Sequence, residues 1–177
     1  RLVSGGGGIT PDILTNAVNK SDYINALWRK KLFLKFASIY VHNNSVEIPV
    51  VITDKIVSDF KVFLGGYDLE YLLPGEKDLG KLEDKLLLYS ENSNSKDFLD
   101  KVLFWRKSED KRLIDKLHRY YEAEKANQFE NSSNHLWIKN GLQREMSMIL
   151  GGTEERIRVS LFEDTDYLKA VEILKNA

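Results

Sequence analysis

The sequence predicts a mainly α protein, in which a helical bundle-like region follows a short extended and loop segment at the amino terminus. Composition is the first reason: from residue 67 to residue 177 the chain has one proline, few β-branched residues and many Lys, Glu, Asp and Leu residues, a mixture that favours helix. Apolar residues also recur three or four positions apart through most of the chain. The sequence contains no internal repeat of a longer segment, so we expect a helical bundle and not a solenoid.

Size and composition limit the class of protein. The chain has 177 residues, 42% of them hydrophobic and 30% charged, so it can bury a core of ordinary size. Its formal net charge of −1 argues against general affinity for nucleic acid, which needs concentrated positive charge. No apolar run approaches the ~20 residues of a membrane-spanning helix, and no signal peptide is recognisable. The absence of cysteine excludes disulfides, thiol catalysis and thiolate metal sites.

The amino-terminal stretch GGGGITPDI, residues 5–13, differs in character from the rest of the chain. Four consecutive glycines can adopt backbone angles closed to other residues, which predicts a close backbone approach or a loop. Pro11 fixes its own φ angle and directs Thr10 toward extended geometry, while Ile9 and Ile13 offer apolar side chains for burial. We therefore expect a loop, a short extended segment and a second loop before the first helix.

The first helix is predicted from residue 21 to about residue 42, with Ser21 as its N-cap. Its apolar residues form one broad face, wide enough to pack against two neighbours: Tyr23, Ile24, Leu27, Leu34, Ala37, Tyr40 and Val41. The polar run Asn43-Asn44-Ser45 ends it. Residues 46–52 are the one run that could form a strand, although Pro49 demotes them to an edge strand or an extended tether.

Caps and glycines delimit the remaining helices. Thr53 caps a helix that Gly65-Gly66 ends. Further helices are predicted at about 75–91, 96–106, 109–130, 135–150, 154–162 and 165–175. Residues 106–112 form either a turn or a solvated stretch inside one long helix.

The best-defined helix of this region is 135–150. Ser133 or Asn134 is its expected cap, and Gly151-Gly152 should end it through positive φ; its apolar stripe is Ile138, Leu142, Met146 and Ile149. The last helix should begin at Asp164 or Thr165. Its apolar residues Leu168, Val171 and Leu174 are expected to face inward.

Few residues offer chemistry. Ser58 with Lys61, and Ser108 with Lys111, have the spacing that places a serine near a lysine base on one helical turn, but chance and a helix surface explain both pairs better in a chain with 26 basic residues. His118 and Glu122 stand four apart, as two metal ligands can. No third ligand is evident, so a solvated helix face is the better interpretation.

Aromatic and glycine-rich segments have similar pairs of interpretations. Trp28 and Trp105, each followed by basic residues, could stack bases, but in a chain of net negative charge they more plausibly anchor a core. An apolar peptide groove could form from Tyr120, Tyr121, Phe129 and Trp137, although core packing is the preferred interpretation. The glycine run could bind an anion, but it lacks the lysine and hydroxyl of a P-loop.

Residues 1–4 (RLVS) followed by GGGGITPDI resemble the end of the protease core in C-terminal processing peptidases, the tail-specific serine proteases, where a segment G-R-x-x-x-G-G-G-I-x-P-D-[IV] follows the catalytic strands. Weaker agreement continues through SDY (21–23), LFLKFA (32–37) and VSDFK (57–61). The family works with a serine nucleophile and a lysine base on S-A-S-A-S-E-like and G-K-G-like segments, and neither segment is present here. The resemblance implies that residues 1–20 are the trailing edge, a remnant, of an α/β protease core.

This resemblance implies three regions: 1–20, 21–66 as a helical connector with one possible short strand, and 67–177 as a helical accessory region. Because the chain opens on Arg1, we expect it to be the non-catalytic C-terminal part of a serine endopeptidase of the bacterial periplasm or cell envelope, with the Ser/Lys dyad upstream. We assign no catalytic residue, cofactor or metal ligand to it. Expected partners are protein or peptide substrates with apolar C-terminal tails, and a homo-oligomer; its role would be structural, oligomerising or substrate-gating. The alternatives are a stand-alone helical interaction module with a Gly-rich linker and an anion-binding domain.

Overall fold

The computed structural model describes residues 13, 15, 19–91 and 99–176, without the side chains of residues 86–91 and 99–110. The described residues form seven helices and no strand, which confirms the mainly α class. In chain order the helices are α1 (Asp22–Arg29), α2 (Leu32–Asn43), α3 (Asp54–Leu64), α4 (Glu76–Glu91), α5 (Leu99–Asn127), α6 (Ser132–Leu161) and α7 (Thr165–Lys175). The glycine run lies outside the described residues.

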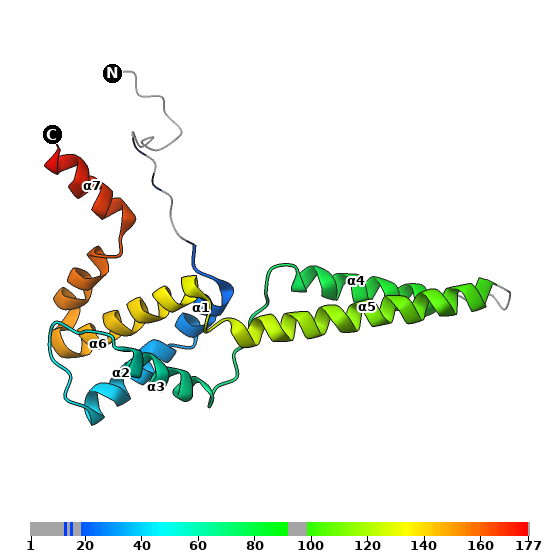
Figure 1. Ribbon diagram of the computed structural model, residues 1–177, viewed down its shortest axis with the longest axis horizontal. Coiled ribbons are helices and arrows are strands. Elements are labelled where there is room, and N and C mark those ends of the chain that lie inside the picture. The colour runs from blue at the N-terminus through cyan, green and yellow to red at the C-terminus, as the bar shows by residue number, and fades with distance from the viewer. Residues whose placement is uncertain (1–12, 14, 16–18, 92–98, 177) are drawn as a thin grey trace, which may run out of the picture.

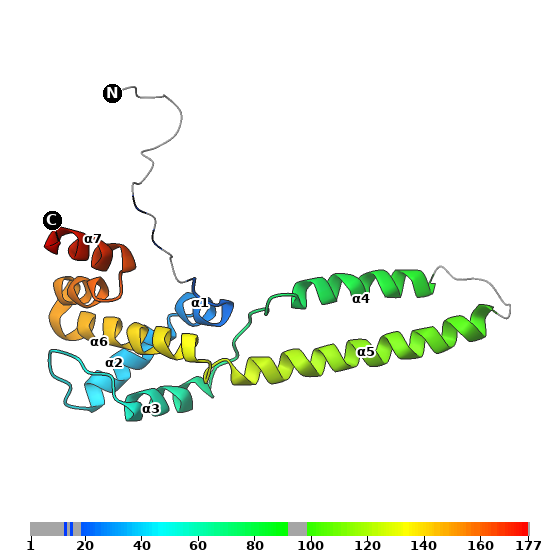
Figure 2. The same cartoon turned by 45° about the horizontal axis from the view of Figure 1, so that its top comes forward.

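Two parts are visible in the arrangement of the helices (Figure 1). Helices α1, α2, α3 and the first part of α6 pack into a body, in which α2 lies along α6. Helices α4 and α5 run side by side as a two-helix arm that extends away from this body (Figure 2). The 29 residues of α5 make a rod about 43 Å long at 1.5 Å per residue. None of the described helices is long and apolar enough to cross a membrane.

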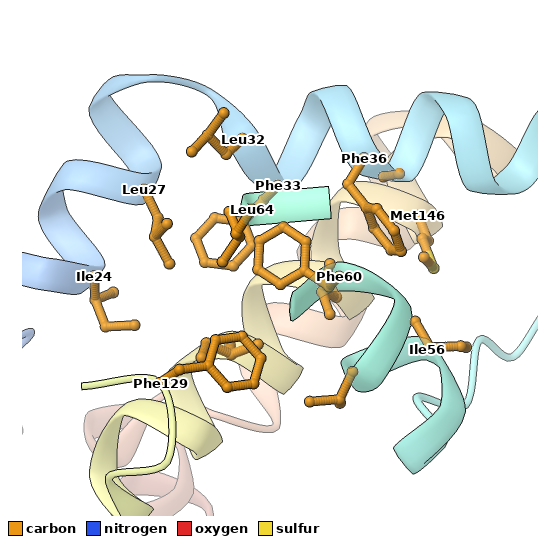
Figure 3. Packing of buried hydrophobic residues seen from close by; sticks show 14 of the residues in the cluster. Ile24, Leu27, Leu32, Phe33, Phe36, Ile56, Phe60, Leu64, Phe129 and Met146 are labelled. Atoms are coloured by element: carbon orange, nitrogen blue, oxygen red, sulfur yellow. The ribbon is translucent and has the colours of Figure 1, made fainter. Parts of the chain in front are cut away.

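Aromatic side chains fill the core of the body (Figure 3). The ring of Phe60 on α3 lies 5.3 Å from that of Phe33 and 5.1 Å from that of Phe36, both on α2. The ring centroid of Phe129, which precedes α6, lies 6.5 Å from that of Phe60. Around them lie further buried apolar residues of α1, α2, α3 and α6: Ile24, Leu27, Leu32, Ile56, Leu64, Ile138, Leu142 and Met146. Residues from both sides of position 66 therefore share one core, while the predicted division at 1–20, 21–66 and 67–177 stays a prediction.

The predicted single helix over 21–42 is wrong, because the chain breaks between α1 and α2. Ser21 caps α1 as predicted, its Oγ accepting from the N–H of Ile24 at 3.2 Å. Lys31 then adopts a left-handed conformation with φ 55°. Leu27 and Leu32 are five residues apart, so in a continuous helix they would point about 140° away from each other. The break lets both side chains enter the same core, and it leaves Leu34 exposed.

Residues 46–52 form a tether that bends at Ile48 and Pro49 and has no strand partner among the described residues. Val50 inserts its side chain into the core, and its carbonyl accepts a hydrogen bond from Nε2 of Gln143 on α6 at 2.8 Å. Thr53 then caps α3 as predicted, its Oγ1 accepting from the N–H of Ile56 at 3.4 Å. The tether is therefore fixed to the body at its centre and at its end.

Helix α5 is continuous, so residues 106–112 lie inside one long helix and the separate helices 96–106 and 109–130 do not form. Helix α6 begins earlier than predicted. Its cap is Asn131, whose Oδ1 accepts from the N–H of Ser133 and of Asn134. Positive φ at Gly152 (73°) breaks the axis of α6, in agreement with the predicted stop at this position.

Helix α7 begins at Thr165 with Asp164 as its cap, as predicted. None of its residues is buried. Leu168 and Leu174 are exposed, so the expectation that they face inward is wrong for the described part of the chain. The predicted stripe of α6 is correct for Ile138, Leu142 and Met146, while Ile149 at its end is exposed.

Candidate interaction surfaces

The serine and lysine pairs with catalytic spacing are not brought together as a dyad in the described residues. Lys61 on α3 donates from Nζ to Oε1 of Glu130 at 2.5 Å, and the same Nζ lies 5.6 Å from the ring of Phe129. Lys61 is thus an ion-pair partner that joins α3 to the start of α6. Ser58 is exposed, and the side chain of Ser108 is not among those described.

His118 does not pair with Glu122, because its side chain contacts a different carboxylate. Nε2 of His118 on α5 pairs with Oε1 of Glu83 on α4, across the arm. Glu122 is exposed. Within the described residues, no group of three or more His, Asp or Glu side chains is arranged to hold a metal ion.

The four aromatic residues of the suggested peptide groove lie in three different environments. Phe129 is in the core, and Trp137 packs against it. Tyr121 contacts the turn before α4, and Tyr120 is exposed beside it, with ring centroids 5.5 Å apart. They therefore do not line one groove, and core packing is the correct interpretation only for Phe129 and Trp137.

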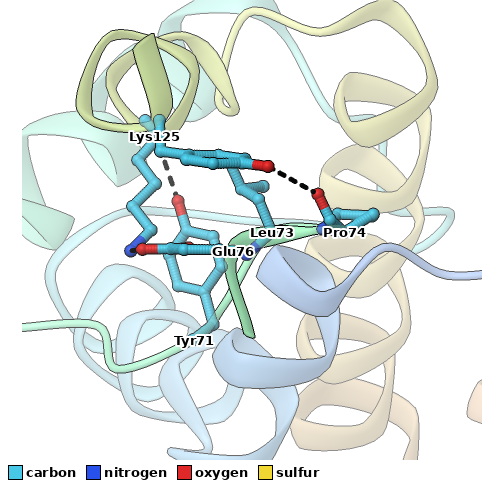
Figure 4. Close-up of polar contacts among 6 residues, drawn as sticks. Tyr71, Leu73, Pro74, Glu76 and Lys125 are labelled. Carbon is cyan, nitrogen blue, oxygen red and sulfur yellow. Dashed lines mark hydrogen bonds and ion pairs between the residues drawn. The ribbon is translucent and has the colours of Figure 1, made fainter. Parts of the chain in front are cut away.

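The base of the arm carries a compact set of polar contacts (Figure 4). Nζ of Lys125 near the end of α5 lies 2.5 Å from Oε1 of Glu76 at the start of α4. Oη of Tyr71 donates to the carbonyl of Lys125 at 3.3 Å, and Oη of Tyr121 donates to the carbonyl of Pro74 at 3.4 Å. These contacts tie both helices of the arm to the segment that leaves the body.

A tight turn fixes the direction in which α4 starts. The N–H of Glu76 donates to the carbonyl of Leu73 at 3.0 Å, and Gly75 has φ 85°. With Pro74 at the second position, these are the features of a type II turn. Oε2 of Glu76 reaches back to the N–H of Leu73 at 2.9 Å. The turn is therefore closed by both the backbone and the side chain of one glutamate.

Burial and charge shift two pKa values at this base. Burial and the nearby Glu76 carboxylate raise the pKa of Tyr71 to about 12. Burial alone would raise the pKa of Glu76, but hydrogen bonds from Lys125 and from the backbone of Leu73, with the charge of Lys125, lower it overall. Glu76 is therefore an ionised anchor and Tyr71 a neutral hydrogen-bond donor at neutral pH.

A second polar cluster surrounds the entry of the chain into α1. Nζ of Lys20 lies 5.0 Å from the ring centroid of Trp137 and 5.6 Å from that of Trp28, and the guanidinium of Arg144 lies 5.5 Å from Trp28. Burial raises the pKa of Glu163, although the charges of Arg144 and Lys20 oppose the rise. Cations over aromatic faces are stabilised by the ring quadrupole. This cluster fixes the incoming chain against α1 and α6.

The end of α6 and helix α7 carry several exposed apolar side chains. Phe162 is 72% exposed and Leu174 is 77% exposed. The other members are Ile157, Tyr167, Leu168 and Ile173. Thr15, in the segment that enters the body, contacts the Asp166 carboxylate at the start of α7 through its hydroxyl. We call the six exposed apolar residues the α7 apolar surface: Ile157, Phe162, Tyr167, Leu168, Ile173 and Leu174.

An extended connector joins α3 to the arm. Its residues Leu69, Glu70, Tyr71 and Leu72 form one wall of an open groove of about 620 Å³. The other lining residues come from α1 and α5: Asp22, Asn25, Arg29 and Lys125. The sequence interpretation missed this groove and the arm base. The alternation of polar and apolar residues in Asp68-Leu69-Glu70-Tyr71 was the available signal.

Comparison with known proteins identifies one family. A family model described as probable PDZ-protease, C-terminal helical domain, matches residues 23–174. Neither the curated proteins nor the solved structures contain a match to the chain. The matched range includes the arm, the connector and nearly all of α7.

Proposed function

The chain belongs to the family of C-terminal helical domains of probable PDZ-proteases, and we propose on this premise that it is the non-catalytic helical part of a serine endopeptidase that processes protein C-terminal tails. The proposed substrates are proteins or peptides with apolar C-terminal tails. The family match favours this function over a stand-alone interaction module. The proposed location is the periplasm or the cell envelope of a bacterium.

The catalytic serine and lysine are proposed to lie upstream of Arg1. The segments that carry them in tail-specific proteases are missing from the 177 residues. Of the two lysines in the candidate pairs, Lys61 forms an ion pair with Glu130 and Lys111 is exposed. We expect the chain on its own to have no peptidase activity toward an unstructured, apolar-tailed substrate.

The role proposed for the domain is to brace the protease core and to guide the substrate. The observation that carries this role is the arm, a two-helix rod held at its base by Glu76, Lys125, Tyr71 and Tyr121. A rod that is fixed at one end can hold a surface tens of ångströms away from the body. The bracing role also draws on the α7 apolar surface, because its large exposed apolar side chains are available for contact with another part of the protease.

The test shortens the arm in the complete protease. Glu83 and His118 are in contact across the arm, so residues 84–117 can be replaced by a short Gly/Asn loop that joins these two positions. Two rates are then measured, cleavage of a protein with an unstructured apolar tail and cleavage of a short chromogenic peptide. We expect the first rate to fall while the second stays unchanged, because only the longer substrate reaches the arm.

A matched control keeps the arm and changes one side chain on the surface of α5. Leu113→Ala removes an exposed apolar side chain without altering the contact between His118 and Glu83. If the shortened protease cleaved the tailed protein as fast as the unshortened protease does, the guiding role would be refuted. An unchanged molar mass and thermal stability after replacing the exposed Phe162 and Leu174 by serine would refute the bracing role.

A further inference from the structure

Helix α7 lacks the cover that a helix of its length needs. It has 11 residues, and none of them is buried. A helix shorter than about 12–15 residues is marginal in water on its own, so it depends on packing for its stability. Tyr167, Val171 and Leu174 follow one another at helical spacing and therefore lie on one side of α7. We call these three residues the α7 stripe; Tyr167 and Leu174 are exposed, and Val171 is half-buried.

The chain that enters the body lies against the start of α7. Oγ1 of Thr15 donates to Oδ1 of Asp166 in the first turn of this helix. Further along, the charge of Lys20 acts on Glu163, the residue before the cap of α7, and opposes the rise in its pKa. Ile13, two residues ahead of Thr15, is exposed. Two contacts of different kinds thus hold the incoming chain at α7, with the open side chain of Ile13 within about 7 Å of chain from Thr15.

The segment ahead of Thr15 is long enough to cover α7. Ile9 is six residues ahead of Thr15, a span of up to about 20 Å when the chain is extended. The 11 residues of α7 make a helix about 16 Å long at 1.5 Å per residue. Ile9 can therefore reach any residue of the α7 stripe. Because the segment is covalently attached at α7, its apolar side chains are held near the stripe at an effective concentration of the order of millimolar.

We propose that residues 9–13 pack on the α7 stripe through their two isoleucines, so that α7 is the docking face for the part of the protein that precedes it in the chain. That this part is a protease core rests on the proposed function; the packing rests on the contact of Thr15 and on the uncovered helix alone. Pro11 fixes its own φ angle and directs Thr10 toward extended geometry, which lowers the entropy lost when the segment becomes ordered. In the complete protease, α7 would then hold the trailing edge of the core against the body.

The test measures native-state hydrogen exchange in the 177-residue chain. The variant Ile9→Ser/Ile13→Ser removes both apolar side chains of the segment. The matched control Leu2→Ser/Val3→Ser makes two comparable changes nearer the start of the chain. Each variant is compared with the unchanged chain at the amides of α7 and, as a reference, at the amide of Met146 in the body.

We expect the isoleucine variant to speed exchange of the α7 amides about tenfold, which corresponds to the lost burial of about two methylene groups. The control variant should leave α7 unchanged, and neither variant should change exchange at Met146. Leu174→Ala gives an independent check, because it removes the other side of the same contact and keeps a good helix former in place. In a chain that already carries Leu174→Ala, the isoleucine variant should speed exchange by less than about threefold.

A nitroxide label distinguishes the segment from a second copy of the chain. The chain has no cysteine, so Thr10→Cys accepts the label at a single site. The label should broaden the amide signal of Leu174 in its own chain. In a mixture, the amide signals of isotope-labelled chains that carry no nitroxide should stay sharp.

Three results would overturn the proposal. They are equal exchange in the isoleucine variant and the unchanged chain, an effect of the isoleucine variant that Leu174→Ala does not reduce, and broadening in the mixture, which would identify a second copy as the occupant. The arm-shortening experiment leaves residues 9–13 and α7 untouched. Its failure would therefore leave this contact standing, and absence of the contact would leave the role of the arm standing.

Discussion

Replacing Gly75 by alanine should loosen the arm without unfolding the body. Gly75 has φ 85°, and a Cβ added there would lie 2.7 Å from Oη of Tyr121. A left-handed backbone costs a residue with a Cβ about 1–2 kcal/mol. Moving the Tyr121 hydroxyl away also loses its 3.4 Å bond to Pro74, worth about 0.5–1 kcal/mol. The expected local destabilisation is therefore about 1.5–3 kcal/mol.

Native-state hydrogen exchange measures this effect at the residue concerned. The N–H of Leu79 donates to the carbonyl of Gly75 at 3.0 Å, so it exchanges when the first turn of α4 opens. A loss of about 1.5–3 kcal/mol raises the open population about 13- to 150-fold. Exchange of the Met146 amide, in the body, should not change.

Two further variants separate the causes. Gly80 lies inside α4, and a Cβ there would meet nothing within 4 Å, so Gly80→Ala should slow exchange by stabilising the helix about 0.5–1 kcal/mol. Adding Tyr121→Phe to Gly75→Ala should recover little of the loss, because phenylalanine also lacks the hydroxyl that bonds to Pro74. If Gly75→Ala slowed exchange as Gly80→Ala does, the assignment of a strained turn at the arm base would be refuted.

Three other outcomes follow from the body and its charges. Phe60→Ala should lower the free energy of unfolding in urea by about 3–5 kcal/mol, because Phe60 is fully buried, whereas Val62→Ala on the solvent side of α3 should change it by less than about 0.5 kcal/mol. Burial raises the folded-state pKa of Glu163 above 4.5, so its ionisation costs stability as the pH rises past 4.5; Glu163→Gln should raise the melting temperature at neutral pH but not below pH 4.5. The folded-state pKa of Glu76 is below 4.5, so its contribution is complete above pH 4.5 and lost on further acidification; Lys125→Met should shift the acid loosening of α4, followed by exchange, to higher pH.

The sequence predicts most helices of this chain because their caps and stops are local. Ser21, Thr53 and Asp164 cap their helices with their own side chains, and Gly152 breaks α6 with positive φ. Each of these signals acts within four residues, which is the range that a pattern in the sequence describes. Confirmed predictions cluster at such positions.

The predicted cap of α6 is wrong because contacts between residues far apart in the sequence determine where this helix begins. Asn134 is of a residue type that often caps helices, but its side chain is buried and engaged elsewhere. Its Oδ1 accepts from Oγ of Ser21 at 2.6 Å, and its Nδ2 donates to the carbonyl of Gln128 at 2.8 Å. These bonds link α6 to α1, and no local pattern specifies them. Asn131, free of such contacts in the described residues, becomes the cap.

Two other errors or open points have a signal in the sequence: the break between α1 and α2, and the continuity of α5. The apolar residues of α1 and α2 are out of phase, with Leu27 and Leu32 five apart, which a continuous helix cannot bury on one side. The continuity of α5 was foreseeable as well, because residues 106–112 contain neither glycine nor proline. The exposed α7 shows the opposite limit: helical spacing of Leu168 and Leu174 predicts an apolar face but not what covers it.

The arm base and the connector groove share residues, and this couples the two. Tyr71 contributes its backbone to the connector edge and its hydroxyl to α5, where it donates to Lys125. Lys125 lines the groove and also holds Glu76 at the start of α4. A change at Lys125 should therefore be felt at both places. Lys125→Met should speed exchange at Leu79 at the start of α4, because Lys125 holds Glu76 there, and it should also loosen the ring of Tyr71, whose hydroxyl donates to the carbonyl of residue 125.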